Sequence, residues 1–215
     1  MNSKNPMHLK AIDEYKKDLK LTNIQREILV GLLLGDGHLE TQNQGKTYRL
    51  KVEHSVAQRE YLVWMYEHFK EWTHAAPSLK SKNGKPFSCW FTTYSHPILN
   101  RYAKLFYRGR QKIVPENLSD FLTPLGLSVW FMDDGSIKSK RHRTYNIHTV
   151  GFKKEEQYVL QKTLLERFNM QTALHRQKGR YWRIYIPSES VLTFQKHVSP
   201  YILPSMRYKL GNANA

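Results

Sequence analysis

A segment of nine residues occurs twice in this chain, and it constrains the fold more than any other feature. The first copy is Leu29-Val-Gly-Leu-Leu-Leu-Gly-Asp-Gly37 and the second is Leu127-Ser-Val-Trp-Phe-Met-Asp-Asp-Gly135. Each copy is an apolar run that ends in an acid and a glycine, and glycine commonly follows the last turn of a helix. The pattern predicts two buried helices that each deliver a carboxylate to a helix C-terminus.

The elements that flank these segments follow the same order in both halves. Thr22 with Gln25 is a capping-box pattern that predicts a helix start, and Thr123 before Pro124 predicts another. Hydrophobic periodicity then predicts a strand, an amphipathic helix, a hairpin and a further helix in each half. The expected hairpin turns are Lys82-Asn-Gly-Lys85 and Arg176-Gln-Lys-Gly-Arg180, and residues 138–143 are expected to form a basic loop. The expected helices span 8–20 (covering the main body), 22–37, 55–72, 96–107, 123–135, 153–168 and 188–198, and the expected strands span 46–53, 87–94, 144–150 and 181–186.

The two halves also match in register. Asp36 and Asp134 are 98 positions apart, and Lys112 and Lys209 are 97 apart. Similar offsets at separate points indicate an internal repeat. No linker rich in proline, glycine or serine separates the halves. We therefore expect an α+β fold of two pseudo-symmetric halves, residues 1–120 and 121–215, that share one interface.

The charge of the chain indicates a polyanionic partner. Its 215 residues include 34 Lys and Arg against 18 Asp and Glu, a formal net charge of +16. Nucleic acid is the commonest partner of such a chain, although solvated lysines on a basic protein are the alternative. Its single cysteine, Cys89, excludes an intrachain disulfide and a cysteine-based zinc site. Without a secretory signal or a bilayer-spanning apolar run, the chain is expected to be intracellular, not secreted, with no membrane partner.

The acid of each segment lies where a helix dipole is negative. That position is unfavourable for a lone carboxylate but suits a divalent cation. If the helices pack side by side, Asp36 and Asp134 would repel each other unless a metal ion lies between them, and hard oxygen ligands suit Mg²⁺. Gly31 and Gly35 would permit close backbone approach. The alternative is two buried helices whose acids are exposed by chance.

The two segments resemble the two signature motifs of single-chain LAGLIDADG homing endonucleases. The similarity runs from Thr22 to Leu210 and includes Trp130-Phe-Met-Asp-Asp-Gly135, Tyr201-Ile-Leu-Pro204 and Tyr208-Lys-Leu210. It implies an αββαββα unit in each half, signature helices packed on a pseudo-twofold axis, and sheets that form saddles for double-stranded DNA. It also implies a monomer that acts in mitochondria as an organelle-encoded protein, or in bacterial or phage cytoplasm.

The resemblance assigns the metal-binding acid to the eighth motif position, which is Asp36 in the first copy and Asp134 in the second. Asp133, at the seventh position, is a competing ligand. It aligns with Gly35 in the first copy, and Asp133 and Gly35 complete the expected metal site. Because the third and seventh positions of the second copy are Val129 and Asp133, the helices are expected to pack less closely there. Mg²⁺ is the expected ion, with Mn²⁺ or Ca²⁺ as alternatives at the same sites.

Other functional residues are also implied. A catalytic lysine near each metal site falls at Lys112 and Lys209, where it could polarise water or offset charge on the phosphate; a phosphate contact or a solvated lysine is the alternative. Glu53 and His148 fall where the family often organises a water network, although a plain sheet-surface role fits both. Residues expected to bind DNA lie on strand faces and loops: Lys46, Arg49, Lys51, Lys80, Lys82, Lys85, Lys138, Lys140, Arg141, Arg143, Arg176, Lys178, Arg180, Arg183 and Tyr185.

Together these features predict a site-specific homing endonuclease that makes a double-strand break in a long, asymmetric DNA target. The reaction would be metal-dependent hydrolysis of one phosphodiester on each strand, and the resemblance implies 3′ overhangs. Two alternatives are an RNA-binding intron maturase on the same fold and a DNA-binding protein with no activity. A maturase would not need both acids, and an inactive DNA-binding protein would be indifferent to the loss of Asp36.

Overall fold

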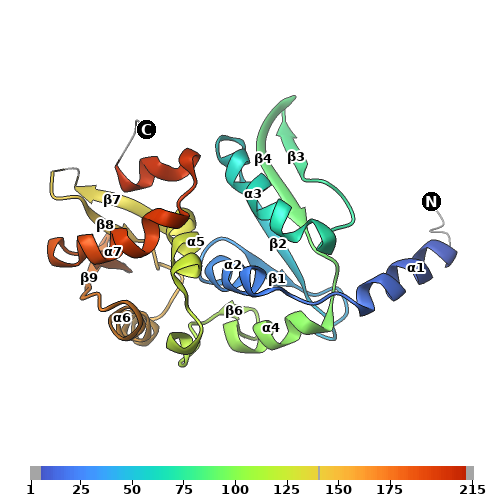
Figure 1. Cartoon of the computed structure of the whole chain (residues 1–215), viewed down its shortest axis with the longest axis horizontal. Helices are drawn as coiled ribbons and strands as arrows, with labels where there is room; N and C mark the ends of the chain where they lie inside the picture. Colours follow the sequence, from blue (N-terminus) through green and yellow to red (C-terminus); the bar gives the residue numbers. More distant parts are fainter. Residues whose placement is uncertain (1–5, 140, 212–215) are drawn as a thin grey trace.

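The computed structural model describes residues 6–139 and 141–211 (Figure 1). The first half contains α1 (Pro6–Lys17), α2 (Asn23–Leu34), β1 (His38–Glu40), β2 (Arg49–Ser55), α3 (Arg59–Phe69), β3 (Ser78–Lys82), β4 (Lys85–Thr92), α4 (Asn100–Phe106), β5 (Tyr107–Arg108) and β6 (Gln111–Lys112). The second contains α5 (Pro124–Asp134), β7 (Gly135–Ser139), β8 (Thr144–Ile147), α6 (Lys154–Phe168), β9 (Ala173–Gln177), β10 (Tyr181–Ile186) and α7 (Val191–Val198).

Short 3₁₀ helices extend or connect several of these elements, so some of the helices expected from the sequence divide into a 3₁₀ and an α segment. They are η1 (Val56–Gln58), η2 (Lys70–Trp72), η3 (Pro97–Leu99), η4 (Leu118–Asp120), η5 (Ser188–Ser190), η6 (Ser199–Tyr201) and η7 (Pro204–Leu210).

Within the described residues, each half contains a four-stranded antiparallel sheet, and the two sheets have the same topology. The strand order is β1-β2-β4-β3 in the first half and β7-β8-β10-β9 in the second. Each half is therefore an αββαββα unit, which confirms the expected fold class. The division at residue 120 stays a prediction.

The sequence pattern does not predict β1 or β7, the strands that directly follow the motif helices. β1 has only three residues, and β7 continues into the basic segment that was expected to be a loop. β1 alternates but is too short to be recognised as a strand, and β7 shows no clear alternation of apolar and polar residues. Pairing with the longer neighbours β2 and β8 therefore decides their conformation.

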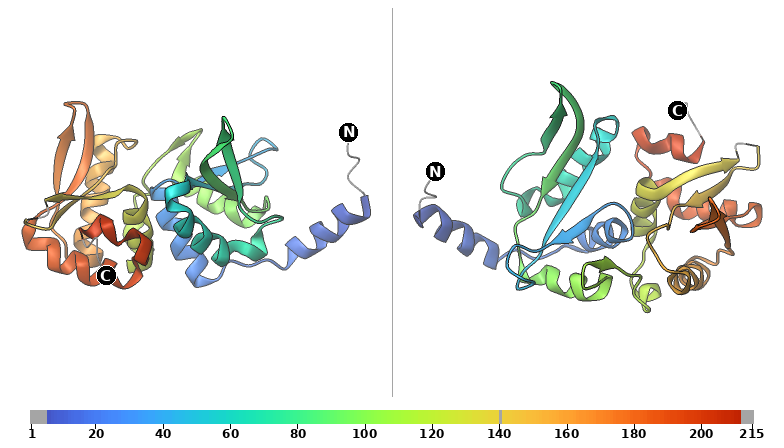
Figure 2. Two further views of the ribbon diagram at one scale, coloured as in Figure 1. Left: turned by 90° about the horizontal axis from the view of Figure 1, so that it is seen from above. Right: turned by 180° about the vertical axis from the view of Figure 1, so that it is seen from behind.

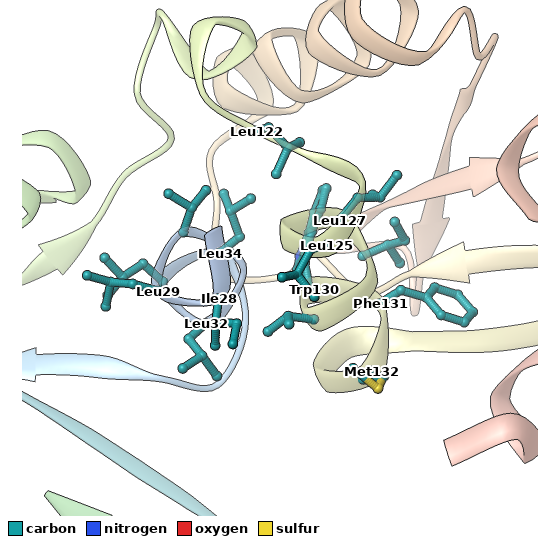
Figure 3. Packing of buried hydrophobic residues seen from close by; sticks show 14 of the residues in the cluster. Ile28, Leu29, Leu32, Leu34, Leu122, Leu125, Leu127, Trp130, Phe131 and Met132 are labelled. Atoms are coloured by element: carbon teal, nitrogen blue, oxygen red, sulfur yellow. The ribbon is translucent and has the colours of Figure 1, made fainter. Parts of the chain in front are cut away.

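The motif helices α2 and α5 lie side by side between the sheets (Figures 1 and 3). A Cβ atom on Gly31 would lie 2.4 Å from the carbonyl oxygen of Gly126 and 2.7 Å from Cβ of Val129. A Cβ atom on Gly35 would lie 2.6 Å from Cβ of Asp133. The expectation of looser packing at Val129 and Asp133 was therefore wrong, because Gly31 and Gly35 make room for the larger side chains of α5.

The sheet faces alternate as the sequence predicts. In β2, Leu50 and Val52 are buried, whereas Lys51 is only partly covered on the opposite face. The turn of the β3–β4 hairpin has positive φ at Asn83 (51°) and Gly84 (74°), as type I′ geometry requires, which confirms the tight turn. The β3–β4 and β9–β10 hairpins rise toward the same side of the molecule (Figure 2).

Two helix positions differ from expectation. α1 projects from one end of the molecule instead of covering its body (Figure 1), and it is attached through the Tyr15 hydroxyl, which donates to the carbonyl of Glu71 at 2.8 Å. α2 ends at Leu34 rather than at Gly37, because the backbone leaves the helix at Gly35.

Every helix in the described part of the chain is too short or too polar to cross a membrane.

Candidate active site

The ends of α2 and α5 bring two carboxylates close enough to interact. Asp36 lies two residues beyond the last residue of α2, and its side chain is 51% exposed. Asp134 is the last residue of α5 and is partly buried. Burial and then the negative charge of Asp36 raise the pKa of Asp134 to about 7. The structure therefore brings together the two acids expected from the motif.

A lysine contacts the backbone just before each of these acids. Lys112 donates through Nζ to the carbonyl of Gly35 at 2.6 Å, and Lys209 donates through Nζ to the carbonyl of Asp133 at 2.7 Å. Burial lowers the pKa of both lysines, while the nearby acids raise it. Lys112 comes from β6 and Lys209 from η7, so different secondary structures place the lysines equivalently.

The side chain of Asp133 lies in the interface between the two halves. Its Oδ2 accepts from the backbone N–H of Asp36 at 2.9 Å, and its Oδ1 accepts from the Tyr61 hydroxyl at 2.8 Å. Both side chains are buried. Burial, followed by the charge of Asp36, raises the pKa of Asp133 well above its usual range. Burial also raises the pKa of Tyr61, which keeps the phenol a neutral donor.

His54 lies between the first acid and Asp133 on the core-facing side of β2. Its Nδ1 is 3.8 Å from Oδ2 of Asp36, and its Nε2 is 3.7 Å from Oδ1 of Asp133. Burial lowers its pKa, which favours the neutral imidazole. Asp36, His54 and Asp133 each offer one ligand atom, and these atoms lie within 4.8 Å of one another.

The donor set at these helix ends suits a divalent cation. Burial and then the charge of Asp36 raise the pKa of Asp133 and of Asp134, and a positive ion would relieve the repulsion among the three carboxylates. The exposed side of Asp36 leaves room for water ligands, and Mg²⁺ usually keeps several waters beside one or two carboxylates. The residues therefore fit the expected ion.

His148 is placed beside the second acid. Its backbone N–H donates to the carbonyl of Asp134 at 3.0 Å, and its ring nitrogens lie 3.0 Å from Ser136 Oγ and 3.3 Å from Gln177 Oε1. A small hollow is lined by Lys112, Asp134 and His148 among others. This position is compatible with the predicted water network.

Glu53 is hydrogen-bonded to two residues of its own sheet. It accepts from Lys80 Nζ at 2.5 Å and from Ser88 Oγ at 2.7 Å, and the bond to Lys80 lowers its pKa. Among the described residues, these hydrogen bonds stay within the first sheet. Glu53 and Lys80 therefore form a fixed pair on the exposed face of that sheet.

In the first half, the polar face of β2 carries two of the residues expected to bind DNA. Arg49 forms an ion pair with Glu40 at 2.6 Å, and Lys51 lies over the ring of Trp90 at 6.0 Å from its centroid. Lys46 lies in the loop before β2. Cations and an aromatic ring on one exposed face are typical of nucleic-acid surfaces.

In the second half, two of the expected residues share a face and one does not. Arg183 and Tyr185 are both in β10, and the Tyr185 ring stacks on His175 with centroids 4.2 Å apart. Arg176 lies over the ring of Trp182, 4.7 Å from its centroid. Because Trp182 pairs with Arg176 and Arg183 pairs with His175, Arg176 lies on the face opposite to Arg183.

The other basic residues expected to bind DNA lie in or beside hairpin turns. Lys140 falls outside the described residues. The rest are Lys82 and Lys85 at the β3–β4 turn, Lys138, Arg141 and Arg143 near the β7–β8 turn, and Lys178 and Arg180 at the β9–β10 turn.

Sequence reasoning missed His54 and Tyr61 as parts of the site. Tyr61 reads as an ordinary apolar residue of an amphipathic helix, and nothing in its local sequence marks its hydroxyl. His54 carries a weak signal, because it continues the apolar face of the alternating strand that holds Leu50 and Val52. Only the folded chain brings both beside Asp133.

Comparisons with known proteins agree with this arrangement. Residues 26–194 match the LAGLIDADG DNA endonuclease family. A probable intron-encoded endonuclease 1 from Wickerhamomyces canadensis is 32% identical over 211 residues, which cover 94% of this chain and 90% of the relative. The cytochrome b mRNA maturase bI2 of Debaryomyces hansenii is 30% identical over 194 residues, which cover 86% of this chain and 73% of the relative.

Among solved structures, the homing endonuclease I-WcaI bound to its DNA recognition sequence is similar over nearly the whole chain. The TM-score is 0.86 at 29% sequence identity, and the match covers 98% of this chain and 94% of that one. The two αββαββα halves and their side-by-side motif helices therefore occur together in a known arrangement.

Proposed function

Because the chain belongs to the LAGLIDADG DNA endonuclease family, we propose that it is a monomeric homing endonuclease that cuts both strands of one long, asymmetric DNA target. The observation that supports this most strongly is the pairing of Lys112 and Lys209, each bonded to the carbonyl before a motif acid. Two equivalent positions suit the hydrolysis of two phosphodiesters, one on each strand.

Asp36 and Asp134 would hold the divalent cation, with Gly35 and Asp133 bordering it through the carbonyls that the lysines contact. Mg²⁺ is the proposed ion, and Mn²⁺ or Ca²⁺ could take the same place. Such an ion lowers the pKa of bound water and stabilises charge that develops on the phosphate. Burial and the charge of Asp36 raise the pKa of Asp134 to about 7, and a bound cation would favour its ionised form.

Lys112 and Lys209 would act on the reacting groups from the two sides of the site. Held by the backbone, each ammonium is oriented before DNA arrives, and it can offset negative charge on the phosphate without further rearrangement. His148, linked to Ser136 and to the carbonyl of Asp134, would orient water near the second acid. The products would be two duplex ends with 3′ overhangs.

Recognition would use the polar strand faces. Arg49 and Lys51 in the first half and Arg183 and Tyr185 in the second lie on these faces and would contact bases or phosphates. Since the two halves differ in sequence, the target would be asymmetric. Much of the affinity would come from phosphate contacts and would fall with salt.

A cleavage selection tests this proposal. The protein is incubated with a library of randomised duplexes and Mg²⁺, and the cut ends are sequenced. We expect one family of long asymmetric sites, and Asp36→Asn should lower cutting by about 1,000-fold or more because a metal ligand is lost. Asp13→Asn, on α1 far from the motif, is the matched control and should cut normally. No cutting at any site, or equal cutting by Asp36→Asn, contradicts the proposal.

The second candidate function is that of an RNA-binding maturase, which the relative named as a cytochrome b mRNA maturase favours. The discriminating variant is Asp36→Asn combined with Asp134→Asn. A maturase would promote splicing of its intron equally well with and without both acids. A DNA-binding protein without activity would bind a selected duplex but would leave it intact.

A further inference from the structure

The two motif acids differ in how their backbone is held. α2 ends at Leu34, and the N–H of Gly35 makes the last bond of that helix, to the carbonyl of Gly31 at 3.0 Å. Asp36 therefore lies outside the helical hydrogen-bond ladder, whereas Asp134 is still part of α5. A backbone N–H that leaves the ladder in a crowded region needs another acceptor.

The acceptor for Asp36 comes from the other half of the protein. The carboxylate of Asp133 accepts the N–H of Asp36 at 2.9 Å. Tyr61 in α3 donates its hydroxyl to the other oxygen of the same carboxylate at 2.8 Å, and it also lies 3.2 Å from the carbonyl of Val129. Tyr61 therefore fixes the direction in which Asp133 points.

Among the described residues, this arrangement has no counterpart at the second acid. The residue of the first motif that aligns with Asp133 is Gly35, which has no side chain to reach across the interface. A side chain at that position would collide with Asp133, because a Cβ on Gly35 would lie 2.6 Å from the Cβ of Asp133. One acid is therefore held by the opposite half, and the other is held by its own helix.

We propose that Asp133 and Tyr61 are positioning residues for Asp36, and that they set how fast one DNA strand is cut relative to the other. This inference rests on the proposed endonuclease function. Neither residue needs to touch DNA or water for this role. Their effect passes through the backbone of Asp36, so it should fall mainly on the strand whose cleavage depends on that end of the site.

Two substitutions remove the support without adding bulk. Tyr61→Phe deletes only the hydroxyl. Asp133→Ala deletes both carboxylate oxygens, which are the acceptors for the Tyr61 hydroxyl and for the N–H of Asp36. Tyr61→Phe therefore loses the bond that orients Asp133, and Asp133→Ala loses both bonds.

Strand-specific kinetics are the first readout. A selected target carries a different fluorophore on each strand, and the cutting rates of the two strands are measured with Mg²⁺. Lys112→Met identifies the strand served by the Asp36 end, because Lys112 contacts the carbonyl of Gly35. We expect Tyr61→Phe and Asp133→Ala to slow the cutting of that strand and so to change the ratio of the two rates by about fivefold or more, the effect of one net hydrogen bond.

Tyr145→Phe is the matched control for a structural effect. Tyr145 is buried, and its hydroxyl is hydrogen-bonded to Gln195 at 2.6 Å and to the carbonyl of Leu210 at 3.3 Å. Its loss should lower stability without changing the ratio of strand rates. An unchanged ratio in Tyr61→Phe and Asp133→Ala, or an equal change in Tyr145→Phe, overturns the proposal.

Amide hydrogen exchange is a second readout that needs no cleavage. The N–H of Asp36 should exchange about tenfold faster in Tyr61→Phe and Asp133→Ala than in the unaltered protein and in Tyr145→Phe. Unchanged exchange overturns the positioning role. If the unaltered protein cuts no DNA, the proposed function fails, and this measurement alone still decides whether Asp133 and Tyr61 hold Asp36.

Discussion

The ends of α2 and α5 carry the same groups but hold them differently. At α2, the acid lies beyond the helix, is 51% exposed and is tied through its N–H to Asp133 from the other half. At α5, Asp134 is the last residue of the helix, is partly buried and has a pKa raised to about 7. Both ends share a lysine bonded to the carbonyl before the acid.

The difference shows which contacts tolerate sequence change. Lys112 contacts the carbonyl of a glycine and Lys209 that of an aspartate, so the lysine contact does not depend on the side chain at the seventh motif position. The contact from Asp133 to Asp36 requires an acid on one helix and a small residue on the other. Backbone contacts preserve the pseudo-symmetry, and side-chain contacts break it.

The feature that both helix ends share, a lysine bonded to the carbonyl before the acid, is tested most directly by replacing the lysines. Lys112→Met and Lys209→Met should each slow DNA cutting by about 100-fold, because each removes a positive charge aimed at the phosphate. The measurement is the single-turnover cutting rate at saturating protein. Lys162→Met, at an exposed lysine of α6, should change the rate less than about twofold. Equal rates in all three variants would refute a role for either lysine in the reaction.

The contact between the halves is tested at Gly31 of α2. Gly31→Ala should destabilise the protein by about 3 kcal/mol, since its Cβ would lie 2.4 Å from a backbone carbonyl of α5. Gly151→Ala is the control: its Cβ would meet no atom within 4 Å, so the change should stay within about 0.5 kcal/mol. Urea unfolding gives both values, and similar stabilities would mean that the helices can separate freely.

The unequal acids should give the metal-free protein an unusual pH dependence. The pKa of Asp134 is raised in the folded state to about 7, so the stability linked to its protonated form is present at low pH and is lost as the pH rises through about 7. A divalent cation should compensate for this loss. We expect Mg²⁺ to raise the Tm by about 5 °C more at pH 8 than at pH 6, measured by calorimetry.

Asp134→Asn is the control for that measurement, because it has no carboxyl group to titrate. The rise in Tm caused by Mg²⁺ should differ much less between pH 8 and pH 6 in this variant. A difference as large as in the unaltered protein would show that another group is responsible.

The smallest expected effect separates the two faces of the second sheet. Arg183→Ala should weaken DNA binding about tenfold, because Arg183 lies on the polar face of β10. It should also reduce the slope of log affinity against log salt concentration by about one. Arg176→Ala should weaken it less than about twofold, because Arg176 lies over Trp182 on the opposite face. Binding is measured by fluorescence anisotropy at several salt concentrations with Ca²⁺ in place of Mg²⁺. A larger effect at Arg176 would reverse the assignment of the DNA-facing side.

Local patterns were sufficient to predict most of the elements. The Thr22–Gln25 capping box is present, with the Thr22 side chain accepting from the N–H of Gln25 at 3.2 Å. The Asn83–Gly84 turn forms where its sequence predicts it. These features depend on neighbours a few residues away, so they can be read without the fold. β1 and β7 could not, since pairing with distant strands decides them.

The sequence by itself determined the repeat, the family resemblance and the pairing of Asp36 and Asp134 with Lys112 and Lys209. The sequence did not decide whether Asp133 or Asp134 is the metal ligand of the second motif. The tertiary structure decided that Asp133 lies across the interface, between Tyr61 and the N–H of Asp36. The physical reason is that the direction of a buried side chain depends on partners far away in the chain, and no local pattern records them.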